Sequence, residues 1–277
     1  MPQSIAPGSL SSLRFERLLL TGAAGGLGKV LRPRLKAYCQ HLRLSDREAL
    51  ANAAEGEELV SAKLEDAAAM DALLRDVNAV VHLGGASLEG PFEPILQANI
   101  VGVYNLYEAA RRNGVKRIVF ASSNHVTGFY RQDEVISPRD PVRPDSYYGI
   151  SKAFGENLSR FYFDRYGIAT ACMRIGSSFP EPTDRRMLST WLSYDDLERL
   201  VVACLGAPVL GHAVVYGMSA NRSLWWDNTC AAHLGFVPQD SSEPFRAGAE
   251  ARQPTLDRDD PTVMYQGGAF VRAGPFE

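Results

Sequence analysis

Tyr148 and Lys152 are the two residues whose types and spacing point most directly to chemistry. They bracket the segment Tyr148-Gly-Ile-Ser-Lys152, so in a helix both side chains would project from one face. A free tyrosine has a pKa of about 10 and is a poor base near neutral pH, but a fixed cation beside it stabilises the phenolate. We therefore expect this pair to transfer a proton.

Two serines, Ser122 and Ser123, follow an apolar run over residues 117–121 that we predict to be a strand. Open α/β sheets bind their ligands at the carboxyl ends of the strands, so this position places a hydroxyl where a substrate would lie. A tyrosine and a lysine at this spacing occur in many ordinary helices, and the serine makes the combination more specific. Tyr148, Lys152 and Ser123 are therefore the predicted catalytic residues.

A glycine-rich loop directly follows the first predicted strand, residues 17–21, and opens a helix predicted over residues 25–38. Small residues let the backbone approach a pyrophosphate closely, and the helix N-terminus supplies free N–H groups and a partial positive charge. The spacing of the loop is G-x-x-G-x-x-G rather than G-x-G-x-x-G. We expect a dinucleotide to bind here, with contacts from Gly22, Gly25, Gly26, Leu27 and Gly28.

Asp46 falls at the end of the second predicted strand, residues 41–45. An acid at this position can accept hydrogen bonds from the adenosine ribose hydroxyls, and it repels a 2′-phosphate. The sequence therefore favours NAD over NADP, although the adjacent Arg47 could neutralise that repulsion.

Small residues also end the strand predicted over residues 79–83. Leu83, Gly84 and Gly85 would let the cofactor cross the sheet edge, and we expect them to contact it. His82 in the same strand is expected to be a core histidine with satisfied hydrogen bonds rather than a ligand.

Apolar runs of strand length alternate with longer helical segments along the first 175 residues. Further strands are predicted at 58–61 and 170–175, and further helices at 66–75, 94–113 and 147–166. Nearly continuous apolar strands separated by helices predict a doubly wound parallel α/β sheet of the Rossmann type, covered on both faces. Beyond Ile175 many prolines interrupt the pattern, which predicts a small irregular substrate lobe. We expect a flexible leader over 1–16, an NAD-binding domain over 17–175, and a lobe over 176–277 that is partly interleaved with the core.

The composition narrows the class of partner. The 277 residues carry a formal net charge of -3, which gives no long-range attraction for nucleic acid or an anionic membrane. No stretch reaches the roughly 18 apolar residues that span a bilayer. The four cysteines are scattered without the spacing of a metal site, so free buried thiols are expected and no metal is. We expect a cytoplasmic protein with a small-molecule substrate.

The ordered motifs TGAAGGLG, LGG, ASSN and YGISK together resemble the extended short-chain dehydrogenase/reductase superfamily. The segments HLGGAS, NIVGVYNLYEAARR, RIGSSFPEP, RMLSTWLSYDDL and SANRSLWWDN resemble the uronate dehydrogenases more narrowly, and the likeness runs from about Arg17 to Phe276. This resemblance implies NAD-dependent oxidation of D-glucuronate and D-galacturonate at C1 to aldaro-1,5-lactones. It also implies a homo-oligomer, since self-association is common on this scaffold.

The resemblance also implies roles for individual residues. Tyr148 would take the proton of the anomeric hydroxyl, Ser123 would hydrogen-bond the same oxygen, and Lys152 would hold the nicotinamide ribose. Arg186 matches the position that binds the uronate carboxylate, a group that a guanidinium can hold through two parallel hydrogen bonds. The adjacent Arg185 leaves that assignment open. The remaining positions matched to substrate contacts are Ser87, Asn124, His125 and Ser177, although such residues also serve in turns and caps.

One position departs from the family pattern. Lys63 stands where relatives usually carry an Asp that contacts adenine, which puts adenine recognition there in doubt, while Leu64 can still pack on the ring. Trp225 and Trp226 also match the family, and we expect them to serve packing rather than chemistry.

Two other functions are compatible with parts of this pattern. A nucleotide-sugar epimerase or dehydratase shares the glycine loop, the serine and the tyrosine–lysine pair, but the segment after Ile175 is short for a nucleotide-diphosphate module. A regulator that only senses NAD would have no need of Tyr148, Lys152 and Ser123 together.

Overall fold

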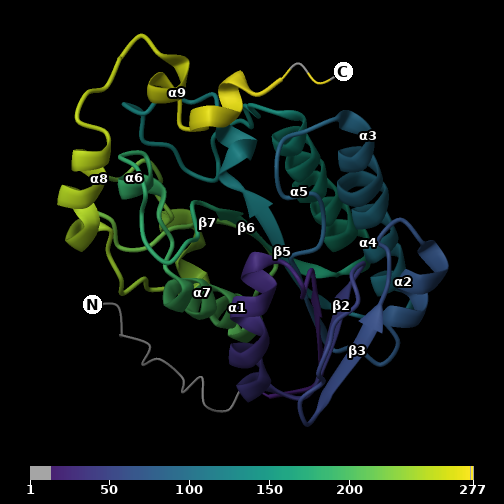
Figure 1. The fold of residues 1–277 in the computed structure, drawn as a ribbon. Helices are drawn as coiled ribbons and strands as arrows, with labels where there is room; N and C mark the ends of the chain where they lie inside the picture. The colour runs from purple at the N-terminus through teal and green to yellow at the C-terminus, as the bar shows by residue number, and fades with distance from the viewer. Residues whose placement is uncertain (1–13, 275, 277) are drawn as a thin grey trace, which may run out of the picture.

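Seven parallel strands form a single sheet in the order β3-β2-β1-β4-β5-β6-β7 (Figure 1). The computed structural model describes residues 14–274 and 276. The strands are β1 (Phe15–Thr21), β2 (Cys39–Asp46), β3 (Glu57–Ser61), β4 (Ala79–His82), β5 (Arg117–Ser123), β6 (Ala169–Ile175) and β7 (His212–Gly217). The chain runs outward from β1 to β3 and then returns to add β4 beside β1. This reversal makes the carboxyl ends of β1 and β4 the expected place for a ligand, and the Rossmann prediction is confirmed.

Helices cover both faces of the sheet, as Figure 1 shows. The helices α1 (Gly26–Leu35) and α7 (Tyr194–Gly206) pack on one face, and α2 (Ala67–Leu73), α4 (Gly102–Arg112) and α5 (Tyr147–Tyr166) pack on the other. Alternating side chains of β1 serve the two layers: Leu18 and Leu20 lie in the first core, and Leu19 in the second. Both faces of β1 are thus apolar, which explains its unbroken run of leucines.

The shorter helical segments complete the fold. They are α3 (Phe92–Ile95), α6 (Met187–Thr190), α8 (Arg246–Arg252), α9 (Pro261–Met264), a π-helical stretch over Leu96–Val101, and 3-10 turns over Lys36–Tyr38, Asn124–Thr127, Thr229–Leu234, Glu243–Phe245 and Gly268–Arg272. Helix α5 matches its predicted range because its ends are well marked. Ser146 caps it by accepting a hydrogen bond from the Gly149 N–H, and Gly167 ends it in the left-handed region at φ 67°.

Three boundaries differ from the sequence prediction. Strand β1 begins at Phe15, inside the range expected as a leader; residues 1–13 lie outside the described part of the chain. Ser122 and Ser123 are the last residues of β5 rather than the residues after it. The segment after Ile175 is also less irregular than expected, because α7 and β7 extend the sheet and its cover.

The C-terminal segments fold back over the carboxyl end of the sheet. Arg131 and Ile136 lie in the loop before α5, and isolated bridges pair them with Tyr265 and Trp226, so this loop is held by two C-terminal segments. Trp226 is 1% exposed and stacks on Tyr216 with ring centres 4.8 Å apart. The tryptophans therefore form a third core, as expected from the sequence.

The cysteines and the length of the helices can be compared with the sequence expectations. All four cysteines are free thiols, but Cys230 is only half-buried, because it lies in a short turn near the surface. Within residues 14–274 and 276, no helix is long and apolar enough to cross a membrane.

Candidate active site

The glycine loop is packed so tightly that only glycine fits at two of its positions. Gly22 has φ +70°, and a Cβ there would lie 2.7 Å from the backbone nitrogen of Gly84. A Cβ on Gly28 would overlap the carbonyl oxygen of Gly22. The loop therefore lies directly against the end of β4 and leaves the first turn of α1 open, as a pyrophosphate site requires. Gly25 and Gly26 are exposed on this turn, and Leu27 is half-buried.

Asp46 ends β2 beside this loop. Its Oδ2 accepts a hydrogen bond from the Ala24 N–H at 2.9 Å, which joins the predicted ribose acceptor to the predicted phosphate loop. Arg47 points into solvent and pairs with Glu48, both side chains being more than 70% exposed. Among the described residues, Arg47 therefore forms no ion pair with Asp46.

Leu64 and Gly84 form the opposite wall of the predicted cofactor groove. A Cβ on Gly84 would lie 3.2 Å from the Leu64 side chain, so these two predicted contacts are neighbours in space. The half-buried Leu83 and exposed Gly85 flank Gly84 at the end of β4, while Lys63 is exposed. The chemistry of these residues suits a dinucleotide, with close-packed glycines, an acid at the end of β2 and an apolar side chain beside them.

Tyr148, Lys152 and Ser123 come together at the carboxyl end of β5. All three are at least 92% buried, and the Lys152 Nζ lies 5.5 Å from the centre of the Tyr148 ring. Burial raises the pKa of Tyr148 to about 12, and the hydrogen bond with Ser123 acts in the opposite direction. Burial lowers the pKa of Lys152 to about 8. The structure thus brings the predicted catalytic residues into one cluster.

Asn99 is a buried site neighbour that the sequence did not reveal. It lies in the π-helical stretch, and its Oδ1 accepts from the Ala86 N–H at 2.7 Å while its Nδ2 donates to the Ala86 carbonyl and to Ser151 Oγ. π-Helical turns often occur at functional sites. Asn99 holds the loop after β4 against the helix that carries Tyr148.

The same loop is anchored a second time by Glu89. Its carboxylate accepts from the backbone N–H groups of Tyr147 and Tyr148, at 3.1 and 2.7 Å. An anion at a helix N-terminus also matches the helix dipole. Ser87 lies between these two anchors, exposed at the mouth of the site, where it makes no side-chain hydrogen bond to another described residue.

Arg186 faces the site, and its neighbour Arg185 does not. Arg186 Nε donates to the Gln266 carbonyl at 2.7 Å and Nη1 donates to Ser177 Oγ at 3.2 Å. In the amide orientation that satisfies its neighbours, Asn124 accepts from Arg186 Nη2 at 2.8 Å. Arg185 instead donates to the Gln253 carbonyl at 2.7 Å. The geometry therefore distinguishes the two arginines, and two predicted substrate residues, Ser177 and Asn124, bind Arg186.

His125 completes the group. Its ring lies 5.9 Å from the Tyr148 ring and stacks on Phe270 at 3.7 Å, measured between ring centres. Phe270 belongs to the C-terminal turn, about 120 positions away in sequence from Tyr148, and no local motif marked it. The C-terminal segment thus supplies one wall of the site.

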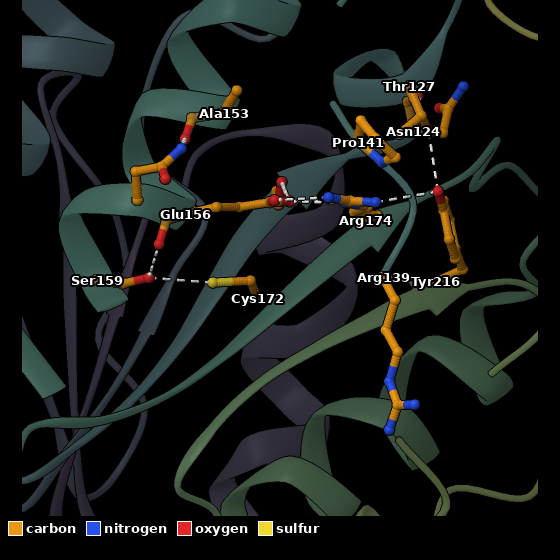
Figure 2. A network of polar contacts seen from close by, with 12 residues as sticks. Asn124, Thr127, Arg139, Pro141, Ala153, Glu156, Ser159, Cys172, Arg174 and Tyr216 are labelled. Atoms are coloured by element: carbon orange, nitrogen blue, oxygen red, sulfur yellow. Dashed lines mark hydrogen bonds and ion pairs between the residues drawn. The ribbon is translucent and has the colours of Figure 1, made fainter. Parts of the chain in front are cut away.

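A buried polar network connects the elements that carry the catalytic residues, and Figure 2 shows its central pair, Glu156 and Arg174. Glu156, one helical turn beyond Lys152, binds Arg174 through two hydrogen bonds of 2.9 and 2.8 Å and accepts a third from Ser122 at 2.6 Å. Arg174 Nη1 also donates to the Tyr216 hydroxyl, which contacts Thr127 at 3.0 Å. The network ties α5 to the end of β5 and to the turn that carries Asn124 and His125.

His82 is only partly the satisfied core histidine that we expected. Its Nδ1 lies 2.7 Å from Thr21 Oγ1, but Nε2 is buried with no hydrogen-bond partner among the described residues. Burial lowers the pKa of His82 to about 3, so the ring is neutral.

A glycine loop shaped for a dinucleotide, at the same sheet edge as a buried tyrosine, lysine and serine, defines a dinucleotide-dependent oxidoreductase of the short-chain type. The sequence matches the family described as "NAD dependent epimerase/dehydratase family" over residues 18–194. A uronate dehydrogenase of Pseudomonas putida is 60% identical over 268 residues, which cover 96% of this chain and 100% of the relative.

Solved structures agree with this assignment. Glucuronic acid dehydrogenase from Chromohalobacter salexigens superposes with a TM-score of 0.92 at 53% identity, covering 94% of this chain and 97% of the other. A mutant of uronate dehydrogenase from Agrobacterium tumefaciens complexed with NAD has the same TM-score at 52% identity, covering 95% and 99%. The chain belongs to the NAD dependent epimerase/dehydratase family and, within it, to the uronate dehydrogenases. It is an NAD-dependent oxidoreductase, which confirms the family resemblance and the choice of cofactor.

Proposed function

We propose that this enzyme oxidises D-glucuronate and D-galacturonate at C1 with NAD and releases the corresponding aldaro-1,5-lactones. The observation that carries the proposal is that Arg186 forms no ion pair with a carboxylate of the described residues. Its guanidinium reaches the site. A half-buried cation without a counterion is suited to an anionic substrate group.

Two of the residues proposed to bind substrate also hold Arg186 in place. Ser177 and Asn124 hold two nitrogens of Arg186, so the guanidinium is fixed in orientation before substrate binds. Fixing a charged donor in advance reduces the entropy lost on binding. We assign the carboxylate to Arg186, the reacting C1 to Tyr148 and Ser123, and the ring hydroxyls between them to Asn124, His125, Ser177 and Ser87.

Proton removal falls to Tyr148. In the proposed reaction Tyr148 takes the proton of the anomeric hydroxyl, Ser123 donates a hydrogen bond to the same oxygen, and the C1–O bond becomes the lactone carbonyl. Bound NAD supplies the acceptor for the hydride that leaves C1. Because burial raises the pKa of Tyr148, its phenolate depends on a nearby positive charge, and Lys152 provides one. Proton transfer of this kind contributes about 10²- to 10⁴-fold in rate.

Cofactor binding is assigned to the residues of the groove. We propose that the first turn of α1 binds the pyrophosphate through Gly22, Gly25, Gly26, Leu27 and Gly28. Asp46 accepts from the adenosine ribose, and Leu64 packs on adenine. Leu83, Gly84 and Gly85 border the groove, while Tyr148 and Lys152 hold the nicotinamide ribose. The packing of Gly84 against both Gly22 and Leu64 supports this path.

The test is to mix the protein with NAD and, in separate reactions, with glucuronate, galacturonate, glucose or UDP-glucose, and to follow NADH. We expect both uronates to be oxidised and glucose to be at least about 100-fold poorer in kcat/KM, since it lacks the charged hydrogen bonds to Arg186. Early product spectra by NMR should contain a lactone before hydrolysis. Equal turnover of glucose and glucuronate would contradict the proposal, and consumption of UDP-glucose would favour an epimerase or dehydratase.

A further inference from the structure

Asp145 forms a buried contact with His125, one of the proposed substrate-binding residues. The Asp145 Oδ2 lies 2.7 Å from His125 Nδ1, and the Asp145 side chain is fully buried. The other carboxylate oxygen accepts from Ser146 Oγ at 2.7 Å. Asp145 directly precedes the cap of α5, so the pair also connects His125 to the helix that carries Tyr148.

Two glycines from distant segments make room for this carboxylate. A Cβ on Gly128 or on Gly267 would overlap Asp145 Oδ2. The two glycines are themselves joined by a backbone hydrogen bond of 2.9 Å, from Gly267 N–H to the Gly128 carbonyl. The carboxylate therefore has a fitted position against the histidine ring, and side chains larger than hydrogen are excluded on both sides of it.

The pairing decides which ring nitrogen of His125 carries the proton. A carboxylate only accepts hydrogen bonds, so Nδ1 must be the N–H donor and Nε2 must carry the lone pair. Nε2 has no hydrogen-bond partner among the described residues, and the His125 side chain remains 12% exposed. The Phe270 stack on the ring limits rotation away from this orientation.

We propose that Asp145 is a positioning residue that holds His125 in the Nδ1–H tautomer, so that Nε2 accepts a hydrogen bond from a hydroxyl of the sugar ring. The substrate part of this inference rests on the proposed uronate oxidation, and the tautomer part does not. A ring position without a hydroxyl would leave Nε2 unpaired, so the pair selects for polyhydroxylated substrates.

The charges around His125 are consistent with a neutral ring in the working enzyme. Burial lowers the pKa of His125, Asp145 and Glu89 act to raise it, and Arg186 acts to lower it. Tyr148 is the other titratable group against the ring. The net direction is downward from the ordinary value, which keeps a lone pair on Nε2 near neutral pH.

The tautomer can be measured without substrate. Protein labelled with ¹⁵N at its five histidines gives ring nitrogen shifts, and the His125→Gln variant assigns the His125 signals. We expect a protonated Nδ1 and an unprotonated Nε2 in the unmodified protein at mildly alkaline pH, and loss of this single tautomer in Asp145→Ala. An Nε2–H tautomer in the unmodified protein would overturn the proposal.

A double-mutant cycle tests whether Asp145 acts through His125. Asp145→Ala should lower kcat/KM for glucuronate about 10- to 100-fold and leave NAD affinity within about twofold. In a His125→Ala background the same change should cost less than about threefold. Equal losses in both backgrounds would show a merely structural role and overturn the inference.

The controls separate this inference from folding defects and from the proposed function. Asp145→Asn keeps the shape between the glycines and an amide oxygen that can still accept from His125 Nδ1–H, so it should lose less kcat/KM than Asp145→Ala. If Asp145→Ala does not fold, the ring nitrogen shifts of the unmodified protein still decide the tautomer. Asp140→Asn makes the same chemical change in a carboxylate that binds Ser137, and its activity should match the unmodified enzyme. If the unmodified enzyme oxidises no uronate, the proposed function is wrong. The tautomer of His125 is still decided by the NMR measurement, which needs no substrate.

Discussion

The ammonium nitrogen of Lys152 lies 5.5 Å from the centre of the Tyr148 ring, and neither side chain is more than 8% exposed. Burial makes this relationship costly in the free protein, because it disfavours both the phenolate and the ammonium. The Tyr148 phenolate and the Lys152 ammonium stabilise one another when both are charged. The burial that suits this pair for proton transfer therefore lowers the free energy of unfolding of the free protein.

Tyr148→Phe should reduce turnover of glucuronate by about 10²- to 10⁴-fold, because it deletes the phenolic oxygen that accepts the proton and leaves the ring in place. NAD affinity, measured by fluorescence titration, should stay within a few-fold of the unmodified protein, since the phenyl ring still fills its place against Phe270. Tyr147→Phe, a hydroxyl deletion on the exposed neighbouring residue, serves as the control. Substantial residual activity in Tyr148→Phe would remove that residue from its role.

Lys152→Met should stabilise the protein near pH 7 while abolishing activity. The pKa of Lys152 falls from an ordinary 10.5 to about 8, so the charged form is penalised in the folded state by at most about 3 kcal/mol. That penalty is fully present below about pH 8 and disappears as the pH rises toward 10.5. Urea unfolding at pH 7 and pH 10 should show a gain for the variant that shrinks at the higher pH.

The exposed Lys29→Met variant controls for the loss of a lysine charge, and its effect on unfolding should be small at both pH values. A Lys152→Met variant that is less stable than the unmodified protein at pH 7 would contradict the argument. So would a gain that is equal at both pH values.

Glu156→Gln should be strongly destabilising, by about 3–5 kcal/mol, because it leaves the buried Arg174 without its counterion. The double variant Glu156→Leu/Arg174→Met should be more stable than Glu156→Gln, since no buried charge remains. It should nevertheless lose kcat, because the hydrogen bond from Ser122 to Glu156 no longer ties the end of β5 to α5. Chemical unfolding and steady-state kinetics measure the two effects separately.

The exposed pair Arg160–Asp164 provides a matched control for that experiment. Asp164→Asn breaks an ion pair of the same helix, and it should change stability by less than about 1 kcal/mol. A double Glu156/Arg174 variant with full kcat would show that the network serves folding alone.

Asp46→Ser should weaken NAD use and admit NADP. The change removes the carboxylate that faces the ribose position and its repulsion of a 2′-phosphate. Arg47→Ala should leave the NAD-to-NADP ratio of kcat/KM near its original value, because that side chain points into solvent. An unchanged NAD-to-NADP ratio of kcat/KM in Asp46→Ser would mean that another group distinguishes the ribose hydroxyl from a 2′-phosphate.

The sequence predicted the elements whose signals are local. The six strands up to Ile175 and the full extent of α5 follow from apolar runs and from the Ser146 and Gly167 caps. Strand β7 was missed because it is a six-residue edge strand that follows Pro208 and Gly211, where pairing with β6 rather than local pattern decides the conformation.

Within the site, too, the sequence predicted the residues that lie in local motifs and missed those that arrive by tertiary packing. Tyr148, Lys152 and the glycine loop carry their own spacing, whereas Asn99, Asp145 and Phe270 reach the site only through tertiary packing. Local sequence could not choose between Arg185 and Arg186, because their side chains diverge only once the C-terminal segment folds back to offer its carbonyls.

The central claim is that Arg186 selects an anionic sugar. The direct measurement is the ratio of kcat/KM for glucuronate to that for glucose, in the unmodified enzyme, in Arg186→Met and in Arg185→Met. We predict a ratio of about 100 or more that falls at least about tenfold in Arg186→Met and changes little in Arg185→Met. A ratio near one in the unmodified enzyme, or a ratio that collapses only in Arg185→Met, would contradict the account.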